Sequence, residues 1–482
     1  MPEQFSSWLA FSMCVYVVGM LALSLYAHRR VHDLEDFVLA GRNLSLPLAI
    51  GTLFATWFGA GTLLTSADEV KERGITAATL DPLGAGLCLI IAGLFFAGRM
   101  WRAKLTTLPE LFERRFGVWP RRSAALLATL PYLGWIAAQF VALAGIMELF
   151  FGLPMNLGLV LVAFVGMLYT VIGGMWAVTL TDSVQVILIV LGVLVTLYCV
   201  LSRTGDGDVS VGLSTIVAKT GDTKLTMIPT ETLAQFTGWL GILCAGALGN
   251  IPSQDIMQRV FAARSATIAK SACLIAGVLY IIIGAGPVIL GLTGAVVLES
   301  SDGNVIPRLA TLFLNPITAL IFCLAILSAI LSTIDSALLA PATMIAHDLV
   351  GTFKNESTRI SWVRWAVVAV GTLSLGLAYL GESAYALLES GYEIGMISLM
   401  APLVFALYTR HGGPIAINAS MYGGILLWSI HLMMEWDYLG DMQALAIPNG
   451  IGCTAIAFVA FGFGLWFERK TCLLYTSPSP RD

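Results

Sequence analysis

Charged residues are scarce in this sequence. Asp, Glu, Lys and Arg together make up 12% of the 482 residues, and there are only five histidines. Soluble globular domains carry about 25% charged residues, so an ordinary soluble protein is excluded. Apolar residues take the place of charge, because 57% of the chain is hydrophobic. The composition therefore predicts a protein whose surroundings are lipid, and we expect no nucleic-acid partner.

Motifs typical of enzymes and metal centres are also missing. None of the eight cysteines has a CxxC or Cys/His metal-binding spacing, and seven of them lie within apolar stretches, as small buried side chains do. There is no Walker motif, no HExxH and no nucleophile signature of acyl transfer. We therefore expect neither an enzyme nor a cofactor. A passive channel is disfavoured, because the chain has no filter-like run of the TVGYG type.

Long apolar runs dominate what is present. Thirteen of them are long enough to cross the roughly 30 Å of hydrocarbon in a bilayer. A chain inside lipid must pair every backbone N–H and C=O internally, so runs of this length are helices. We predict an all-α, polytopic membrane protein whose first run is a retained helix. The runs lie at about residues 7–27, 46–68, 78–100, 122–151, 154–174, 176–201, 232–252, 268–292, 315–346, 362–380, 386–408, 413–434 and 447–467.

Basic residues are distributed unequally between the loops. If thirteen spans alternate, the loops on one side carry 19 of the 26 Lys and Arg residues and those on the other side carry 6, with Arg481 left in a C-terminal tail. Loops rich in Lys and Arg stay in the cytoplasm. We therefore predict a multi-pass protein of the cell membrane (plasma or inner), with the N-terminus outside and the C-terminus in the cytoplasm.

The last stretch, residues 471–482, is unlike what precedes it. It follows a basic end at Glu468-Arg469-Lys470, reads TCLLYTSPSPRD and resembles translated sequencing-adapter sequence. We expect residues 1–470 to form the transmembrane domain and leave this non-native tail out of the fold prediction.

Two of the predicted spans are interrupted by glycine and proline. The second span has Gly59 and Gly61 at its middle, and the seventh contains Gly249 and the helix-ending Pro252. Glycine also occurs where membrane helices simply pack closely. Two breaks at matching positions of two halves, however, are typical of transporters, in which freed backbone dipoles face substrate and ion. Five helices separate the breaks, which predicts two repeats of opposite topology. The predicted parts are an extra N-terminal helix (7–27), repeat one (about 46–201), repeat two (about 232–408) and C-terminal helices (413–467).

The ninth span carries the adjacent hydroxyl residues Ser332 and Thr333 in an apolar helix. Hydroxyls can bond the carbonyl one turn back, but an adjacent pair is more than packing requires. A hard monovalent cation takes oxygen ligands, and these two hydroxyls with the carbonyl of Ala329 would supply three. The carbonyls of Thr56 and Gly59, released by the break in the second span, would supply two more. We predict a cation site without a carboxylate, from which the ion could leave again.

Short motifs in a fixed order carry a family resemblance. They are Ala40-Gly41-Arg42, Leu108-Pro109-Glu110 with Arg115-Phe116-Gly117, Gly173-Gly174 with Thr181-Asp182, Gln258-Arg259 with Ala262-Ala263-Arg264, and Ala329-Ile330-Leu331-Ser332-Thr333. In this order they resemble the sodium/solute symporter family, which includes proline, galactose, sialate and high-affinity choline transporters. The similarity runs from about Asp36 to at least Arg410.

The resemblance implies a fold of inverted repeats, alternating access and one sodium site between the second and ninth spans. The resemblance implies that the five positions named above are the ligands of this site and that Na⁺ is the coupling ion. Asp182 matches a family aspartate near the cytoplasmic side of the sixth span, where it would attract exiting sodium or cap its helix. The implied partners are sodium, a small organic solute and the lipid bilayer, with the protein functional as a monomer.

Within the family, the chain is most similar to the choline transporters. Trp57 and Trp135 match two positions of their aromatic cage, in which indole faces hold a quaternary ammonium by cation–π attraction. Gln139 lies in the same span as Trp135, and Ser253 stands where the choline transporters have a further tryptophan. We predict these four as substrate-binding residues, with a choline-like amine and an amino acid both open as solute. Phe58 stands where proline transporters have an aspartate, which disfavours proline.

Two functions follow from these features. The first is secondary active transport, the sodium-coupled symport of a small organic solute by alternating access. The second is a transporter-like membrane sensor domain truncated from a signalling kinase, because the native sequence after Lys470 is open. Intact ion ligands favour transport.

Overall fold

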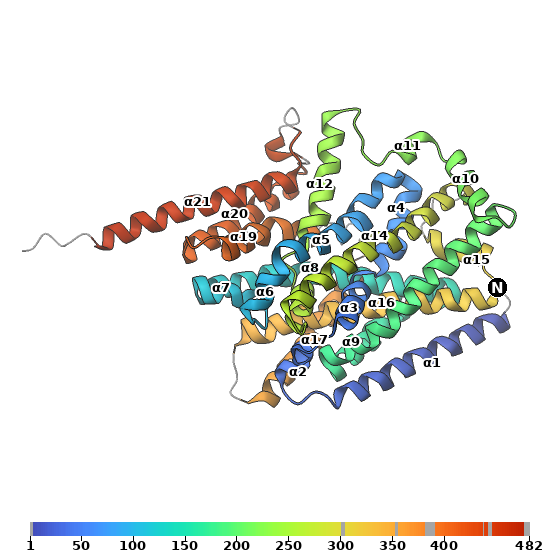
Figure 1. Cartoon of the computed structure of the whole chain (residues 1–482), viewed down its shortest axis with the longest axis horizontal. Helices are drawn as coiled ribbons and strands as arrows, with labels where there is room; N and C mark the ends of the chain where they lie inside the picture. The colour runs from blue at the N-terminus through green and yellow to red at the C-terminus, as the bar shows by residue number, and fades with distance from the viewer. Residues whose placement is uncertain are drawn as a thin grey trace, which may run out of the picture.

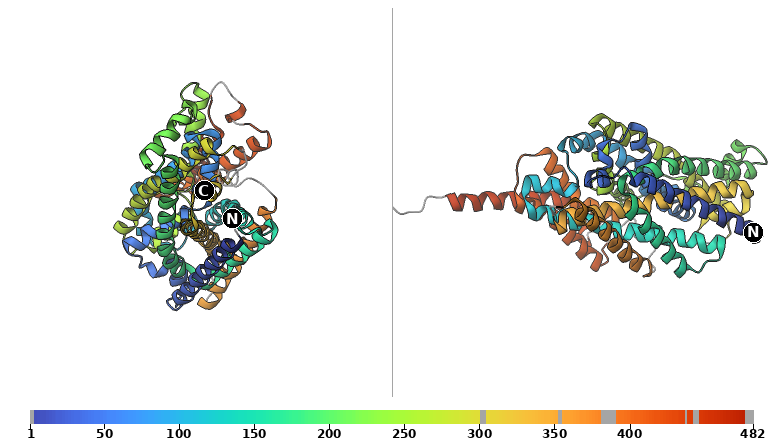
Figure 2. Two further views of the ribbon diagram at one scale, coloured as in Figure 1. Left: turned by 90° about the vertical axis from the view of Figure 1, so that its right-hand side faces the viewer. Right: turned by 90° about the horizontal axis from the view of Figure 1, so that it is seen from below.

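The computed structural model describes residues 3–299, 304–351, 355–380, 391–436, 438–441 and 446–476. Within these residues the chain is helical and has no strand, only two isolated β-bridges. The long helices run side by side along the length of the molecule (Figure 1). α1 (Glu3–His28) begins at one end and α21 (Asn449–Thr476) finishes at the opposite end, as the predicted odd number of spans would require (Figure 2).

The N-terminal half contains the peripheral α1 and a set of helices that follow it. α1 packs on the outside of the bundle against α9 and α16 (Figure 1). The helices of this half after α1 are α2 (Leu34–Leu39), η1 (Ala40–Arg42), α3 (Leu46–Trp57), η2 (Gly61–Thr65), α4 (Ser66–Arg73), η3 (Ile75–Thr79), η4 (Leu80–Gly84), α5 (Ala85–Ile91), η5 (Ala92–Phe96), α6 (Ala97–Ala103), α7 (Leu108–Phe116), α8 (Val118–Phe151), α9 (Met155–Thr204), α10 (Val209–Lys219) and α11 (Asp222–Leu225).

The C-terminal half contains the second interrupted span and the last two long helices, α20 and α21, which pack against each other. Its helices before α21 are α12 (Leu233–Gly249), α13 (Gln254–Ala262), α14 (Ala266–Val297), α15 (Val305–Phe313), α16 (Pro316–Met344), η6 (Ile345–Val350), α17 (Glu356–Ala378), η7 (Met396–Met400), α19 (Ala401–Tyr408), α20 (Pro414–Met433) and η8 (Leu439–Asp441).

Helix α16 is the centre of the bundle. It is buried without interruption from Ala325 to Met344 and packs against α3, α8, α9 and α17. A helix that is apolar on all sides is expected to be buried on all sides. The polar residues of α16 therefore lie in the protein interior and not against lipid, which is where a transport site belongs.

The number of spans needs one adjustment against the thirteen predicted runs. Among the described residues, ten helices are long and apolar enough to cross a membrane, and eleven if the bent pair α3 and η2–α4 forms one span. The remaining two runs are accounted for by α9, which joins two predicted runs in one 50-residue helix, and by α12, which is only 17 residues long. The all-α membrane fold is thus confirmed.

Gly174 explains how α9 serves as two spans. A straight helix of 50 residues would be roughly 75 Å long, far more than the hydrocarbon thickness. At Gly174 the backbone leaves helical geometry (φ 54°, ψ −154°), a conformation open only to glycine. A side chain here would also collide with Phe37 of α2. The chain therefore reverses at this residue, close to the predicted boundary between runs 154–174 and 176–201.

Candidate functional site

The first helix break frees a run of backbone carbonyls. α3 ends at Trp57, Phe58 has non-helical torsion angles (φ −78°, ψ 65°), and the chain resumes as a helix at Gly61 with a bend of 59°. The last carbonyls of a helix have no partner within it. Here the carbonyl oxygens of Ala55, Thr56 and Trp57 are the ones that accept hydrogen bonds from side chains of other helices.

Ser332 and Thr333 of α16 supply two of those side chains. The Ser332 hydroxyl lies 2.8 Å from the Ala55 carbonyl oxygen and 2.9 Å from that of Ala329. The Thr333 hydroxyl lies 2.9 Å from the carbonyl oxygens of both Thr56 and Ala329. We call these five groups the oxygen cluster: the carbonyls of Ala55, Thr56 and Ala329 and the hydroxyls of Ser332 and Thr333. All of its atoms are neutral oxygens, the ligand type that suits a hard monovalent ion.

The oxygen cluster brings together four of the five predicted ligand residues and adds Ala55. The fifth, Gly59, lies directly against Thr333, but its carbonyl accepts the backbone N–H of Leu63 at 3.0 Å and is not freed by the break. The sequence predicted where the helix is interrupted. Which carbonyls face α16 depends on the backbone torsion angles at the end of α3, and these could not be predicted. The role of these residues as sodium ligands stays a prediction.

Gln139 of α8 secures the other side of the break. Its side-chain oxygen accepts the backbone N–H of Ala60 at 2.9 Å, and the residue is fully buried. It does not line the cavity described below, and its predicted contact with solute stays a prediction. Its observed contact replaces one of the backbone acceptors lost where the helix is interrupted.

Gly59→Ala is expected to damage the oxygen cluster selectively. A methyl group at this position would overlap the Thr333 hydroxyl and come within 2.9 Å of the Gln139 oxygen. Overpacking of this kind typically costs about 1–3 kcal/mol. We expect the half-saturating sodium concentration for uptake to rise about tenfold. The matched control is Gly145→Ala on α8, where an added methyl group would meet nothing within 4 Å; equal effects of the two changes would contradict the expectation.

A small cavity lies beside the second helix break, between α8, the turn that joins α12 to α13, and residues 391–399. We call it the inner cavity; its wall includes Tyr132, Trp135, Asn250, Ser253, Asp255 and Tyr392. Its volume is about 30 Å³, room for about two water molecules. The walls must therefore move apart before an organic solute fits.

Two of the four predicted substrate-binding residues line the inner cavity. Trp135 and Ser253 line it, whereas Trp57 and Gln139 do not. Gly249 and Pro252, predicted at the second break, lie at the end of α12 and in the turn that follows, so the interruption occurs at the predicted place. Their role as hinges stays a prediction.

Asp255 is the charged group in the wall of the inner cavity. Its carboxylate accepts a hydrogen bond from the Trp57 indole N–H at 2.6 Å and another from the Tyr132 hydroxyl. It is 1% exposed. Trp57 therefore does not line the cavity itself but bonds the carboxylate that does. In the sequence Asp255 follows the end of the predicted run 232–252, so no ionisable residue inside an apolar span drew attention to it.

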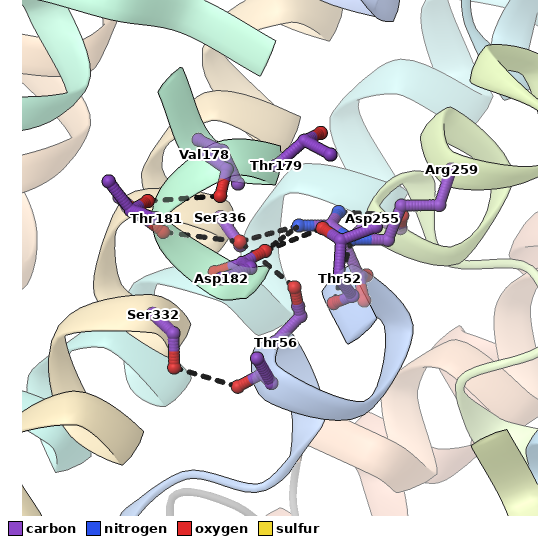
Figure 3. Close-up of polar contacts among 12 residues, drawn as sticks. Thr52, Thr56, Val178, Thr179, Thr181, Asp182, Asp255, Arg259, Ser332 and Ser336 are labelled. Carbon is purple, nitrogen blue, oxygen red and sulfur yellow. Dashed lines mark hydrogen bonds and ion pairs between the residues drawn. The ribbon is translucent and has the colours of Figure 1, made fainter. Parts of the chain in front are cut away.

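A second buried polar group joins α3, α9, α13 and α16. Arg259, 1% exposed, lies 3.9 Å from the Asp182 carboxylate and donates to the hydroxyls of Thr52 and Ser336 (Figure 3). Thr52 in turn donates to Asp182. These contacts cross between helices, so Asp182 does not cap its own helix, which was one of its two predicted roles. Arg259 was visible in the sequence only as part of a family motif.

Several atoms around this group lack a hydrogen-bond partner in the described part of the chain. They include the second carboxylate oxygens of Asp182 and Asp335 and both amide atoms of Gln185. Asp335 lies about one helical turn beyond Ser332 on α16, so its unpaired carboxylate oxygen belongs to a residue close to the oxygen cluster. No group of three or more His, Cys, Asp or Glu side chains with metal-binding geometry occurs among the described residues.

These features agree with what comparison shows. Residues 37–423 match the sodium:solute symporter family. The chain belongs to this family. The high-affinity choline transporter 1 of Homo sapiens is 27% identical to the symporter over 416 residues, 82% of this chain and 70% of that protein. The corresponding protein of Caenorhabditis elegans is 25% identical over 440 residues (86% and 72%), and the sodium/proline symporter of Escherichia coli (strain K12) is 27% identical over 481 residues (93% and 92%).

Solved structures show the same fold. A Na⁺-coupled sialic acid symporter in a substrate-bound, outward-open state matches with a TM-score of 0.76 at 18% identity, covering 96% of this chain and 98% of that one. A nucleobase–cation symporter in a closed conformation matches with a TM-score of 0.60 at 15% identity, covering 90% and 95%. The predicted fold of inverted repeats with broken helices is therefore confirmed. The relatives support sodium-coupled symport, and they do not favour the truncated sensor.

Proposed function

We propose that this symporter carries a small organic ammonium cation into the cell, driven by sodium that binds at the oxygen cluster. Asp255 is the observation that carries the choice of solute. Its carboxylate has only neutral hydrogen-bond donors, Trp57 and Tyr132, and it takes part in no ion pair recorded among the described residues. Arg259 bonds the backbone carbonyl of Asp255 and not its side chain. A buried charge without a counter-ion is costly, and a cationic solute would supply one.

The walls of the inner cavity favour the same solute. Trp135 and Tyr392 offer aromatic faces, which attract a quaternary ammonium by about 2 kcal/mol each when desolvated. No Lys or Arg occurs among the described residues that line it, so the carboxylate of an amino acid would find no cationic side chain there. Of the relatives reported above, the choline transporters fit this chemistry better than the proline symporter does.

Sodium and solute would be coupled through the end of α3. Ala55 and Thr56 contribute carbonyls to the oxygen cluster, and the next residue, Trp57, holds Asp255 at the inner cavity. Binding at one site thus fixes the segment that also shapes the other. Asp182, whose second oxygen is unpaired, would attract sodium as it leaves. Our proposal retains the predicted orientation, N-terminus outside and C-terminus in the cytoplasm, location in the cell membrane and function as a monomer.

Asp255→Asn is the direct test of the solute. Asparagine keeps the shape and an acceptor for Trp57 but removes the charge. We expect the KM for choline or tetramethylammonium in proteoliposomes to rise at least about tenfold, since loss of one partner of a buried charge pair costs about 2–5 kcal/mol. The neutral analogue 3,3-dimethyl-1-butanol should not compete.

The control for this change is Asp222→Asn, which removes an exposed carboxylate in α11. A panel of amines and amino acids, measured with and without a sodium gradient, decides between solutes. Sodium-driven uptake of a neutral amino acid, with no competition from amines at millimolar concentrations, would refute an organic cation as the solute.

A further inference from the structure

A larger cavity lies next to the inner cavity, between α12, α20 and the start of α21. We call it the outer cavity; its wall includes Ala245, Glu393, Trp428, His431, Glu435 and Trp436. Its volume is about 370 Å³, within the range of small-molecule sites and more than ten times that of the inner cavity. α12 stands beside the C-terminal helices at this point (Figure 1). By the predicted orientation this is the outside of the membrane.

The outer cavity is negatively charged. Glu393 and Glu435 line it, and no Lys or Arg does so among the described residues of its wall. His431 lines the same wall: its Nε2 is 2.7 Å from the Gly440 backbone nitrogen, and its Nδ1 is 2.8 Å from the Leu427 carbonyl oxygen.

Aromatic rings complete the wall. The Trp428 indole N–H donates to Glu393 at 3.0 Å, which orients the carboxylate. The Trp436 ring packs edge to face against His431, with ring centroids 5.4 Å apart. Carboxylates combined with fixed indole rings are the groups that recognise an organic ammonium ion.

Neighbouring residues of the same two segments line the two cavities. Ala245 of α12 lines the outer cavity, and Gly249, one turn later, lines the inner one. Tyr392 and Glu393 are adjacent in the chain and line the inner and outer cavity respectively. A carboxylate in the wall of each cavity accepts an indole N–H: Asp255 from Trp57, which does not itself line the inner cavity, and Glu393 from Trp428, which lines the outer one. The same chemistry therefore occurs twice along one path.

We infer that the outer cavity is a second binding site for the organic cation, which the solute occupies before it reaches the inner cavity. The inference rests on the proposed function, because it takes the same ligand class. Glu393 and Glu435 supply the negative charge, and Trp428 and Trp436 supply the aromatic faces. Because the two sites are separate, one protein molecule can bind two cations at the same time.

The test is equilibrium binding of radiolabelled tetramethylammonium to the full-length chain in lipid nanodiscs. The unmutated protein should bind two equivalents, and Asp255→Asn should bind one. Adding Glu393→Gln or Glu435→Gln to Asp255→Asn should weaken the remaining site at least about tenfold. Glu435 is exposed, so its change carries little risk to folding. Glu231→Gln, an exposed carboxylate before α12, is the matched control and should have no effect.

The outcomes separate this inference from the proposed function. If Asp255→Asn alone abolishes all binding, or if neither glutamate affects the remaining site, the outer cavity is not a cation site. If Glu393→Gln and Glu435→Gln each remove one equivalent while Asp255→Asn removes none, the outer site is supported and the proposed role of the inner cavity fails.

Discussion

The double variant Ser332→Ala/Thr333→Ala is expected to lose the dependence of uptake on sodium. Each hydroxyl lies within hydrogen-bonding distance of two carbonyl oxygens of the oxygen cluster, so each would face an ion held there. A hydrogen-bonding contact to a charged group is worth about 1.5–3 kcal/mol. Loss of one hydroxyl should therefore raise the half-saturating sodium concentration by about tenfold or more, and loss of both should remove stimulation by sodium in the accessible range.

Uptake in proteoliposomes at graded external sodium measures this effect. Thr343→Ala is a close control, because Thr343 is a buried threonine of the same helix whose hydroxyl bonds the Leu339 carbonyl at 2.8 Å. It should leave the sodium response unchanged. Full coupling in the double variant, or uptake by the unmutated protein that ignores sodium, would show that the oxygen cluster is not the coupling site.

Arg259→Met is expected to destabilise the protein strongly. Its guanidinium is the positive charge beside Asp182, and both side chains are fully buried. Removing one partner of a buried ion pair leaves the other uncompensated, at a cost of about 3–5 kcal/mol. Replacing both partners, as in Asp182→Asn/Arg259→Met, should restore part of the lost stability, because the Asp182 charge that the single change leaves uncompensated is then removed.

Thermal unfolding in detergent, followed by size-exclusion chromatography, measures this prediction. Arg264→Met removes an exposed arginine only five residues further along the chain and is the control. If Arg259→Met unfolds at the same temperature as Arg264→Met, or if the double variant is no more stable than the single one, the two charges do not depend on each other as the structure indicates.

The sequence alone predicted the features that arise from local chemistry. Long apolar runs identify membrane helices whatever their neighbours, and a broken helix is visible in its glycine and proline. The pair Ser332 and Thr333 was recognisable because two adjacent hydroxyl residues in an apolar helix are more than packing requires. These predictions succeed because each depends on residues within one span.

Features that depend on contact between distant segments could not be predicted in this way. That Ala55, and not Gly59, faces Ser332 follows from the torsion angles of Phe58 and from the position of α16. That Trp57 bonds Asp255 joins residues almost 200 positions apart. The boundaries of the two repeats stay a prediction, and of the unusual tail, residues 477–482 lie outside the described residues.

The oxygen cluster has a consequence for the return half of a transport cycle. A hydroxyl has one proton, yet Ser332 and Thr333 each lie close to two of three carbonyls, so the bonds among them can be exchanged without moving a helix. The hydroxyls bond the carbonyls of Ala55 and Thr56 and so join α16 to α3. A carrier that has released its cargo must change orientation while empty. Here the hydroxyls that would bind the ion can also pair with the carbonyls of α3, so that step need not leave those carbonyls without a hydrogen bond.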